Sequence, residues 1–226
     1  MASPKDTLHE QLARLGKALA APARLAMLDA LSQGPRTVER LAAATGQSVA
    51  NASQHLQVLR QAQLVTSEKR GLFVTYALAS DDVGHLFVRL RELGERQLAE
   101  LRLAREELLA DATGTEKVNR ATLLARLRSG QAILVDVRPH DEYVAGHLPG
   151  AVSAPLDELG KRLKELAKGR EVVAYCRGPY CMLSADAVRL LKRRGYRARR
   201  LDDGVLEWRA AGLKIVTGEE PGARRA

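Results

Sequence analysis

The sequence predicts a two-domain chain in which a mainly helical domain precedes an α/β domain. Its 226 residues are enough for two compact cores. Leucine-rich helical periodicity runs through the first half and is interrupted by polar residues at 111–116. In the second half, the apolar run 172–175 leads through a glycine-containing loop into the helical pattern 183–188, the strand-to-helix order of an α/β fold. We therefore expect domains at residues 1–112 and 117–218.

A helix-turn-helix pattern lies in the first domain. A turn at Gly46 precedes a second predicted helix over 49–60, on which Ala52, Leu56 and Leu59 share an inward stripe. The other face carries hydroxyl, amide, imidazole and guanidinium groups, which suit base edges and phosphates in the major groove. The candidate DNA contacts on this helix are Ser48, Asn51, Ser53, Gln54, His55, Gln57 and Arg60.

Two alternating segments follow the second helix and predict a β-hairpin. They cover residues 64–68 and 72–78, with Lys69, Arg70 and Gly71 between them. A basic hairpin tip would act as a wing that contacts phosphate. Lys69 and Arg70 are therefore further candidate DNA contacts.

The formal net charge of +9 is uneven along the chain. Most of the excess lies in residues 113–226, so overall basicity does not by itself argue for DNA binding by the first domain. The basic run 192–200 is typical of a solvated helix face, although it could attract an anionic ligand or DNA. With neither a signal peptide nor an apolar stretch of membrane-spanning length in the sequence, we expect a cytoplasmic protein without a membrane partner.

The two cysteines of the chain, Cys176 and Cys181, begin and end the loop Cys-Arg-Gly-Pro-Tyr-Cys. In a reducing compartment such a pair favours catalysis or sensing over a structural disulfide. Amide groups at the start of the next helix should depress the pKa of Cys176. A cysteine phosphatase needs an arginine six positions after the cysteine, where Met182 stands, which argues against phosphoryl transfer. The loop residues between the cysteines are Arg177, Gly178, Pro179 and Tyr180.

Cys181 has two interpretations that the sequence leaves open. Its thiol could resolve a persulfide on Cys176 as an intraloop disulfide and release the outer sulfur as sulfide, which would make a redox switch. It could equally be a small buried apolar residue at the helix start. Two thiolates without nearby histidines leave a zinc site short of ligands, and His85 lacks a second histidine. We expect neither a metal nor a cofactor.

Four ordered motifs in the second half resemble the rhodanese family of sulfurtransferases. The resemblance covers about residues 121–216 and implies a three-layer α/β domain with a parallel sheet. It also implies that Cys176 is a nucleophile that carries sulfur as a persulfide, with Arg177, Asp136 and Arg138 as further catalytic residues. The motifs are Asp-Val-Arg at 136–138, Glu-Tyr at 142–143 with Gly-His-Leu-Pro-Gly-Ala at 146–151, Tyr-Cys-Arg-Gly at 175–178, and Asp-Gly-Val-Leu-Glu-Trp at 203–208.

The first half resembles the arsenic-type (ArsR) winged-helix repressors. The segments that carry this resemblance are 22–31, 41–42, 53–56 and 59–65, and it covers about residues 8–109. It implies a homodimer paired through the first and last helices, with the recognition helices in successive major grooves. The leucines expected at the dimer seam are Leu12, Leu15, Leu19, Leu86, Leu90, Leu93, Leu101 and Leu108.

Together these features predict a DNA-binding transcriptional repressor whose affinity for double-stranded operator DNA is coupled to sulfur or redox chemistry at Cys176. The expected partners are a second copy of the chain, a small anionic sulfur donor such as thiosulfate or polysulfide, and a thiol acceptor. The alternative is an active sulfurtransferase whose winged helix serves localisation or dimerisation. A third possibility is a repressor with a vestigial rhodanese domain, against which the presence of Cys176, Arg177, Asp136 and Arg138 argues.

Overall fold

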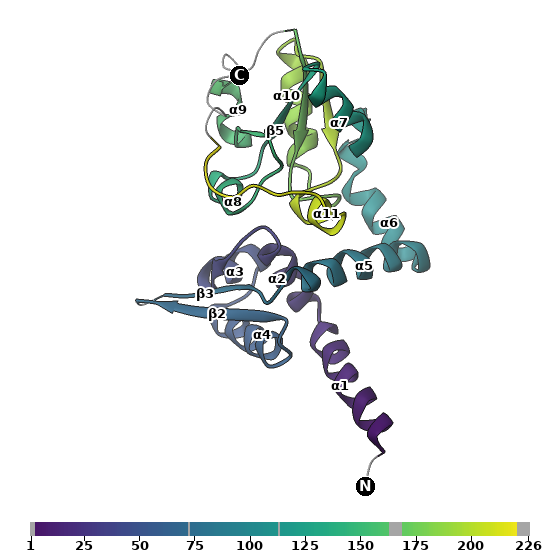
Figure 1. Ribbon diagram of the computed structural model, residues 1–226, viewed down its shortest axis with the longest axis vertical. Helices are drawn as coiled ribbons and strands as arrows, with labels where there is room; N and C mark the ends of the chain where they lie inside the picture. Colours follow the sequence, from purple (N-terminus) through teal and green to yellow (C-terminus); the bar gives the residue numbers. More distant parts are fainter. Residues whose placement is uncertain (1–2, 72, 113, 163–168, 221–226) are drawn as a thin grey trace. The chain divides into compact units, whose positions relative to one another are not determined.

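The computed structural model describes residues 3–71, 73–112, 114–162 and 169–220 (Figure 1). Contacts group the chain into two compact units, Met1–Phe87 and Val88–Ala226. This division falls inside one helix, α5 (Asp81–Gln97), which begins in the first unit and ends in the second. The boundaries 1–112 and 117–218 remain a prediction. Among the described residues, no helix is long and apolar enough to cross a membrane.

The first unit is a helical domain with a small antiparallel sheet of strand order β1-β3-β2, the architecture of a winged helix-turn-helix. Its core is formed by apolar side chains that include Met27, Leu41, Leu56 and Leu59. Besides the start of α5, its elements are α1 (Pro4–Leu19), α2 (Pro22–Leu31), β1 (Arg36–Thr37), α3 (Val38–Thr45), α4 (Val49–Gln61), β2 (Val65–Arg70) and β3 (Phe73–Leu78).

Local sequence explains the turn between α3 and α4. Gly46 ends α3 with a φ of 65°, a left-handed conformation that favours glycine. Ser48 then caps α4, because its hydroxyl oxygen accepts the backbone N–H of Asn51 at 3.2 Å. Ala52, Leu56 and Leu59 are fully buried, which confirms the predicted inward stripe of the second helix.

The β-hairpin extends further than the sequence pattern indicated. Lys69 pairs with Val74 and Arg70 with Phe73, so both basic residues belong to β2 and not to the turn. The chain reverses at Gly71, whose φ of 62° suits a tight hairpin turn. The predicted wing is present. Its two strands extend as far as the turn, because Lys69 and Arg70 are part of the backbone pairing.

The predicted seam leucines separate into two groups. Leu15 and Leu19 are partly buried and pack against the core of the first unit, so a place at the dimer seam stays a prediction for these two. Leu101 is partly buried. The remaining members are exposed apolar side chains: Leu12, Leu86, Leu90, Leu93 and Leu108.

The second unit contains a five-stranded parallel sheet of order β4-β8-β7-β5-β6 with helices on both faces (Figure 1). Its strands are β4 (Lys117–Val118), β5 (Ala132–Asp136), β6 (Val152–Ser153), β7 (Glu171–Tyr175) and β8 (Ala198–Leu201). Its helices, besides the end of α5, are α6 (Ala99–Leu108), the 3₁₀ turn η1 (Ala110–Ala112), α7 (Arg120–Arg128), α8 (His140–Ala145), α9 (Leu156–Arg162), α10 (Leu183–Arg193) and α11 (Val205–Ala210).

Alternate residues of the central strands supply two separate cores. Ile133 and Val172 lie in a cluster with side chains of α9 and α10. Their neighbours Leu134 and Val173 lie in another cluster with side chains of α7, α8 and α11, including Trp208. Because side chains alternate between the faces of a strand, these clusters are the two interfaces of a helix-sheet-helix sandwich. The three-layer α/β fold with a parallel sheet is therefore confirmed.

Candidate functional site

The cysteine loop leaves the sheet at the end of its central strand, β7. Tyr175 is the last residue of β7, and its register partner on β5 is Asp136. The carboxyl ends of adjacent parallel strands meet at one edge of the sheet, which is where open α/β sheets place their ligand sites. Loop residues 176–182 follow at that edge, before α10 begins at Leu183.

Below the loop, Asp136 and Arg138 form an ion pair with no exposed surface. Arg138 Nη2 donates to Asp136 Oδ2 at 2.6 Å and to the carbonyl oxygen of Gly146 at 2.7 Å. The Tyr175 hydroxyl donates to Asp136 Oδ2 at 2.6 Å and accepts the Leu148 N–H at 3.1 Å. Burial alone would lower the pKa of Arg138, but the Asp136 charge raises it above its usual value. Burial, followed by that same charge, raises the pKa of Tyr175.

This buried network bears on two of the predicted catalytic residues. The side chains of Asp136 and Arg138 are sealed from solvent and touch protein groups, and a catalytic role for them stays a prediction. They hold the end of β7 and the backbone at Gly146, and Tyr175 immediately precedes Cys176. Their place in the fold is therefore that of positioning residues under the loop. Buried, fully hydrogen-bonded networks of this kind rigidify the segments that they join.

Cys176 is buried, with 1% of its surface exposed. Its sulfur donates to the carbonyl oxygen of Cys181 at 3.3 Å and lies 3.3 Å from Ser184 Oγ. The hydrogen bond with the Cys181 side chain, then burial, raise the pKa of Cys176 well above its usual value. The sequence argument predicted a depressed pKa here, and that prediction is wrong because the hydrogen bond with Cys181 and burial outweigh the hydroxyl and backbone N–H of Ser184, which act in the opposite direction.

Cys181 is the more accessible thiol, since it is only partly buried. The hydrogen bond from Cys176 lowers the pKa of Cys181 to about 6, against the opposing effect of burial. The backbone N–H groups of Arg177 and Leu183, and the positive charge of Arg177, act in the same direction. These surroundings therefore favour a negative charge on Cys181 over one on Cys176.

Arg177 pairs with a carboxylate that the sequence argument did not single out. Its Nη2 donates to Glu142 Oε1 at 2.7 Å and its Nε to Oε2 at 2.9 Å. Hydrogen bonding to Glu142 raises the pKa of Arg177. Glu142 is buried, so part of the Arg177 charge is already balanced by this bidentate pair. The only sequence signal for Glu142 was its place in the Glu-Tyr motif.

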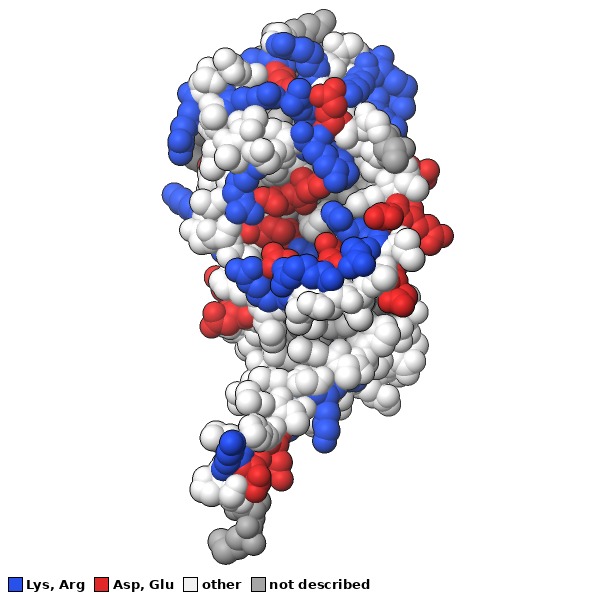
Figure 2. All heavy atoms as spheres, turned by 90° about the vertical axis from the view of Figure 1, so that its right-hand side faces the viewer, with Lys and Arg blue, Asp and Glu red and all other residues white. Residues whose placement is uncertain are grey.

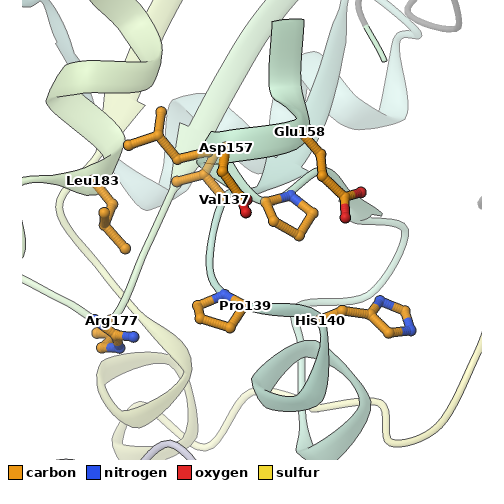
Figure 3. A pocket seen from close by; sticks show the side chains of 9 residues that line it. Val137, Pro139, His140, Asp157, Glu158, Arg177 and Leu183 are labelled. Atoms are coloured by element: carbon orange, nitrogen blue, oxygen red, sulfur yellow. The ribbon is translucent and has the colours of Figure 1, made fainter. Parts of the chain in front are cut away.

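A pocket of about 450 Å³ opens beside the loop. In Figure 3, Arg177 and Leu183 lie on one side of it, and His140 and Glu158 lie on the other. The pocket is thus lined by Arg177, which lies in the cysteine loop, and by Leu183, which directly follows the loop. Its lining consists of Val137, Pro139, His140, Pro155, Leu156, Asp157, Glu158, Arg177 and Leu183.

Two glycines allow the chain to pack closely around the loop. A methyl group on Gly204 would lie 2.5 Å from the carbonyl carbon and oxygen of Arg177. One on Gly178 would lie 2.7 Å from Glu207 Oε2, and Gly178 has a φ of 133°. Glu207 in turn accepts the Gly204 N–H at 2.8 Å. The Asp-Gly motif before α11 is therefore a backbone support for the loop.

The end of helix α5 also contacts the loop, and both belong to the second unit. The Tyr180 hydroxyl donates to Glu95 Oε1 at 2.7 Å, and the Arg91 guanidinium lies 5.3 Å from the centre of the Tyr180 ring. Arg91 Nη2 also pairs with Glu207 Oε1 at 2.5 Å. Burial and the Glu95 hydrogen bond raise the pKa of Tyr180. Sequence reasoning missed Arg91, Glu95 and Glu207, because these contacts join residues far apart in the chain.

The structure places the predicted DNA contacts along α4 and the wing. Asn51, Gln54 and Gln57 are exposed, whereas Ser53 and His55 are partly buried. The Ser48 hydroxyl is engaged in the helix cap, and Arg60 Nη1 lies 3.4 Å from Ser67 Oγ. Of the two candidate contacts on the wing, Lys69 is exposed. The side chain of Arg70 lies outside the described part of the structure.

Three of the six basic side chains in the run 192–200 form ion pairs with acidic side chains. Lys192 and Arg199 both pair with Glu116, and Arg200 pairs with Asp202 at 2.9 Å. On the face shown in Figure 2, acidic and basic side chains lie next to one another. The run is therefore partly charge-balanced, and its last member, Arg200, is buried in β8. Among the residues that the structure describes, no three His, Cys, Asp or Glu side chains are arranged to hold a metal ion.

Comparison with known proteins finds similarity in both halves. Residues 119–211 match the rhodanese-like domain family, and residues 19–68 match a helix-turn-helix domain family. The HTH-type transcriptional regulator Rv0324 of Mycobacterium tuberculosis is 45% identical over 218 residues, which is 96% of each chain. A sulfurtransferase of Allochromatium vinosum is 36% identical over 88 residues, 38% of this chain and 80% of that protein.

A solved structure also shares sequence with the first half. This chain is 39% identical in sequence to the protein in the solution NMR structure of the homodimeric winged helix-turn-helix DNA-binding domain of Mb0332 from Mycobacterium bovis. The aligned region covers 44% of this chain and 93% of the Mb0332 domain, with a TM-score of 0.41. The similarity to Rv0324 runs through both halves at 45% identity. The chain therefore belongs to the HTH-type transcriptional regulators in which an ArsR-type winged helix-turn-helix domain is joined to a rhodanese-like domain.

Proposed function

We propose that this protein is a homodimeric repressor whose affinity for double-stranded operator DNA changes with the sulfur or redox state of the cysteine loop. The observation that carries the proposal is the hydrogen bond from Tyr180, inside the loop, to Glu95 of α5. A change at the cysteines thereby has a route into a helix that also belongs to the first unit.

The route starts at the bond between the two cysteines. Cys176 Sγ now donates to the carbonyl oxygen of Cys181, and a disulfide between their sulfurs would replace that hydrogen bond. We expect the backbone at 180–181 to adjust, because a disulfide needs its own dihedral angle and Cβ separation. Tyr180 directly precedes Cys181, so its hydroxyl would move relative to Glu95.

Helix α5 connects this contact to the first unit along the chain. It is continuous from Asp81 to Gln97. Arg91 adds a second attachment through Glu207, in a pair whose side chains are 9% and 10% exposed. Coupling between two sites on one protein is typically worth about 1–3 kcal/mol, or about 5- to 150-fold in affinity. We expect a change of this size between the reduced and the oxidised loop.

The DNA-binding half of the proposal is supported by the polar surface of α4. Gln54 and Asn51 are exposed on a helix that follows a glycine turn, and amide side chains can pair with adenine in the major groove. The exposed leucines of α1, α5 and α6 support homodimer formation, because exposed apolar side chains at helical spacing favour burial against a partner.

The test is a titration of duplex DNA carrying the site that the full-length protein selects from a random library. Affinity is measured with and without prior treatment by inorganic polysulfide, for the wild type, Glu95→Gln and Glu92→Gln. Glu92 lies on the same helix but pairs with Arg89, so Glu92→Gln is a matched control. We expect polysulfide to change affinity in the wild type and in Glu92→Gln, and much less in Glu95→Gln.

The alternative function is an active sulfurtransferase whose winged helix serves localisation or dimerisation. The pocket beside Arg177 favours this candidate, since it gives a small sulfur donor or thiol acceptor access to the loop. The same titration separates the two functions. Equal DNA affinities before and after polysulfide treatment, together with catalytic turnover of thiosulfate or polysulfide, would exclude the sensor and leave the sulfurtransferase.

A further inference from the structure

The exposed large apolar side chains of the first unit fall into two sets in the described part of the chain. One set lies on α1 and α5, the helices through which the proposed homodimer would pair: Leu8, Leu12 and Leu86. The other set lies on α4 and on the hairpin: Val49, Val58 and Phe73. A seam between first and last helices does not account for exposed valines on α4, so these two need a different explanation.

Nothing in the folding of the first unit calls for a valine at position 49. Val49 is 47% exposed, and it is not among the described side chains that pack with the core of this unit. Valine is β-branched and therefore has a lower helix propensity than alanine. The cap of α4 is supplied by the preceding residue, Ser48. Burial, propensity and capping thus leave the identity of Val49 unexplained.

The place of Val49 in the helix-turn-helix puts it close to bound DNA. Residues 19–68 match a helix-turn-helix family, and α4 is the helix that follows the turn at Gly46. In this motif the second helix enters the major groove, and its N-terminal residues contact base edges. Val49 is the first residue of α4. Val58, which is 38% exposed, lies roughly 14 Å further along the same helix.

The major groove offers an apolar side chain one kind of partner. Base pairs present hydrogen-bond donors and acceptors there, and the apolar group among them is the C5 methyl of thymine. We propose that Val49 reads the methyl group of a thymine in each half-site of the operator. This inference rests on the DNA-binding half of the proposed function. It adds a base-specific contact to the polar candidates on α4, which the sequence argument considered alone.

The expected effect follows from the apolar surface that the contact removes from water. Loss of one thymine methyl group should weaken binding about fourfold, as burial of a single methyl group does elsewhere. A homodimer presents two copies of α4, one to each half-site. Loss of the methyl group in both half-sites should therefore weaken binding about 15-fold, if the two contacts are independent.

The first measurement needs no variant. The full-length wild type selects its duplex site from a random library, and each thymine of that site is then replaced, together with its symmetry mate, by deoxyuridine. Deoxyuridine differs from thymidine only in lacking the C5 methyl group, so base pairing and phosphate contacts are unchanged. Affinities are measured by fluorescence anisotropy at one salt concentration. We expect one symmetric pair of thymines to show the loss of about 15-fold.

The second measurement identifies the residue that reads the methyl group. It repeats the titrations with Val49→Ala and with Val58→Ala, a matched control because it removes the same side chain from the same helix. Circular dichroism checks the helix content of both variants, which alanine should preserve as the better helix former. We expect Val49→Ala to bind the unmodified site more weakly and to lose its dependence on the methyl group. Val58→Ala should keep the full dependence.

Each contrary outcome has a distinct meaning. A selected site in which no thymine depends on its methyl group would overturn the assignment while leaving operator binding intact. The same conclusion follows if folded Val49→Ala keeps the wild-type dependence, or if Val58→Ala loses it instead. A wild type that selects no duplex sequence from the library would overturn both this inference and the DNA-binding half of the proposed function.

Discussion

Gly204→Ala tests whether close backbone packing supports the cysteine loop. The φ of Gly204 is −105°, a conformation open to any residue, so the effect of alanine is steric. Its methyl group would lie 2.5 Å from the carbonyl carbon and oxygen of Arg177 and 2.8 Å from the Gly178 nitrogen. These are backbone atoms, which cannot rotate away as the end of a side chain can. Relief requires the loop and α11 to separate.

The expected cost is that of overpacking a well-packed site, about 1–3 kcal/mol in the free energy of unfolding. With a urea m-value of about 2 kcal/mol/M, the unfolding midpoint should fall by about 0.5–1.5 M. The fluorescence of Trp208 is a suitable probe, because this is the single tryptophan of the chain and lies buried in α11. It reports on the second unit without a signal from the first.

Gly160→Ala is the matched control. Gly160 lies in α9 of the same unit, and a methyl group there would meet no atom within 4 Å. Alanine inside a helix is up to about 1 kcal/mol more favourable than glycine, so the midpoint should stay equal or rise. A midpoint for Gly204→Ala that equals or exceeds the wild-type value would refute the argument that the loop rests on the Gly204 backbone.

Three further predictions concern the candidate site, helix α4 and the wing. Tyr175→Phe removes the hydroxyl that joins Asp136 to the Leu148 N–H, and should lower the free energy of unfolding by about 1–3 kcal/mol in the same urea assay. The alkylation rate of Cys181 should rise as pH increases through about 6 and then level, because deprotonation produces the reactive thiolate. Alkylation of Cys176 should need alkaline pH, because the pKa of Cys176 is raised. Parallel pH profiles would contradict the separate environments of the two thiols. Gln54→Ala should reduce discrimination between selected and unrelated DNA, whereas Lys69→Ala should weaken both alike and lower the salt slope by about 1, as measured by titration at several salt concentrations.

The sequence determined the elements of this protein and their order. The inward stripe on α4 and the strand-to-helix order around the cysteines are repeating patterns, and helix and strand impose those periods on their own residues. The apolar run 172–175 and the helical pattern 183–188 likewise located the loop between β7 and α10. Local backbone geometry is sufficient for all of these predictions. Only details of pairing at the wing required a shift, by two residues at the hairpin tip.

Tertiary structure alone decided the state of each side chain at the site. The depressed pKa lies at Cys181 and not at Cys176, because the hydrogen bond between the two cysteines raises the pKa of Cys176 and lowers that of Cys181, and burial raises that of Cys176 further. Arg177 pairs with Glu142, 35 positions away in the sequence, and the Tyr180 hydroxyl donates to Glu95, 85 positions away. Charge, burial and hydrogen bonding depend on which distant segments the fold brings together. No local pattern in the sequence records that information.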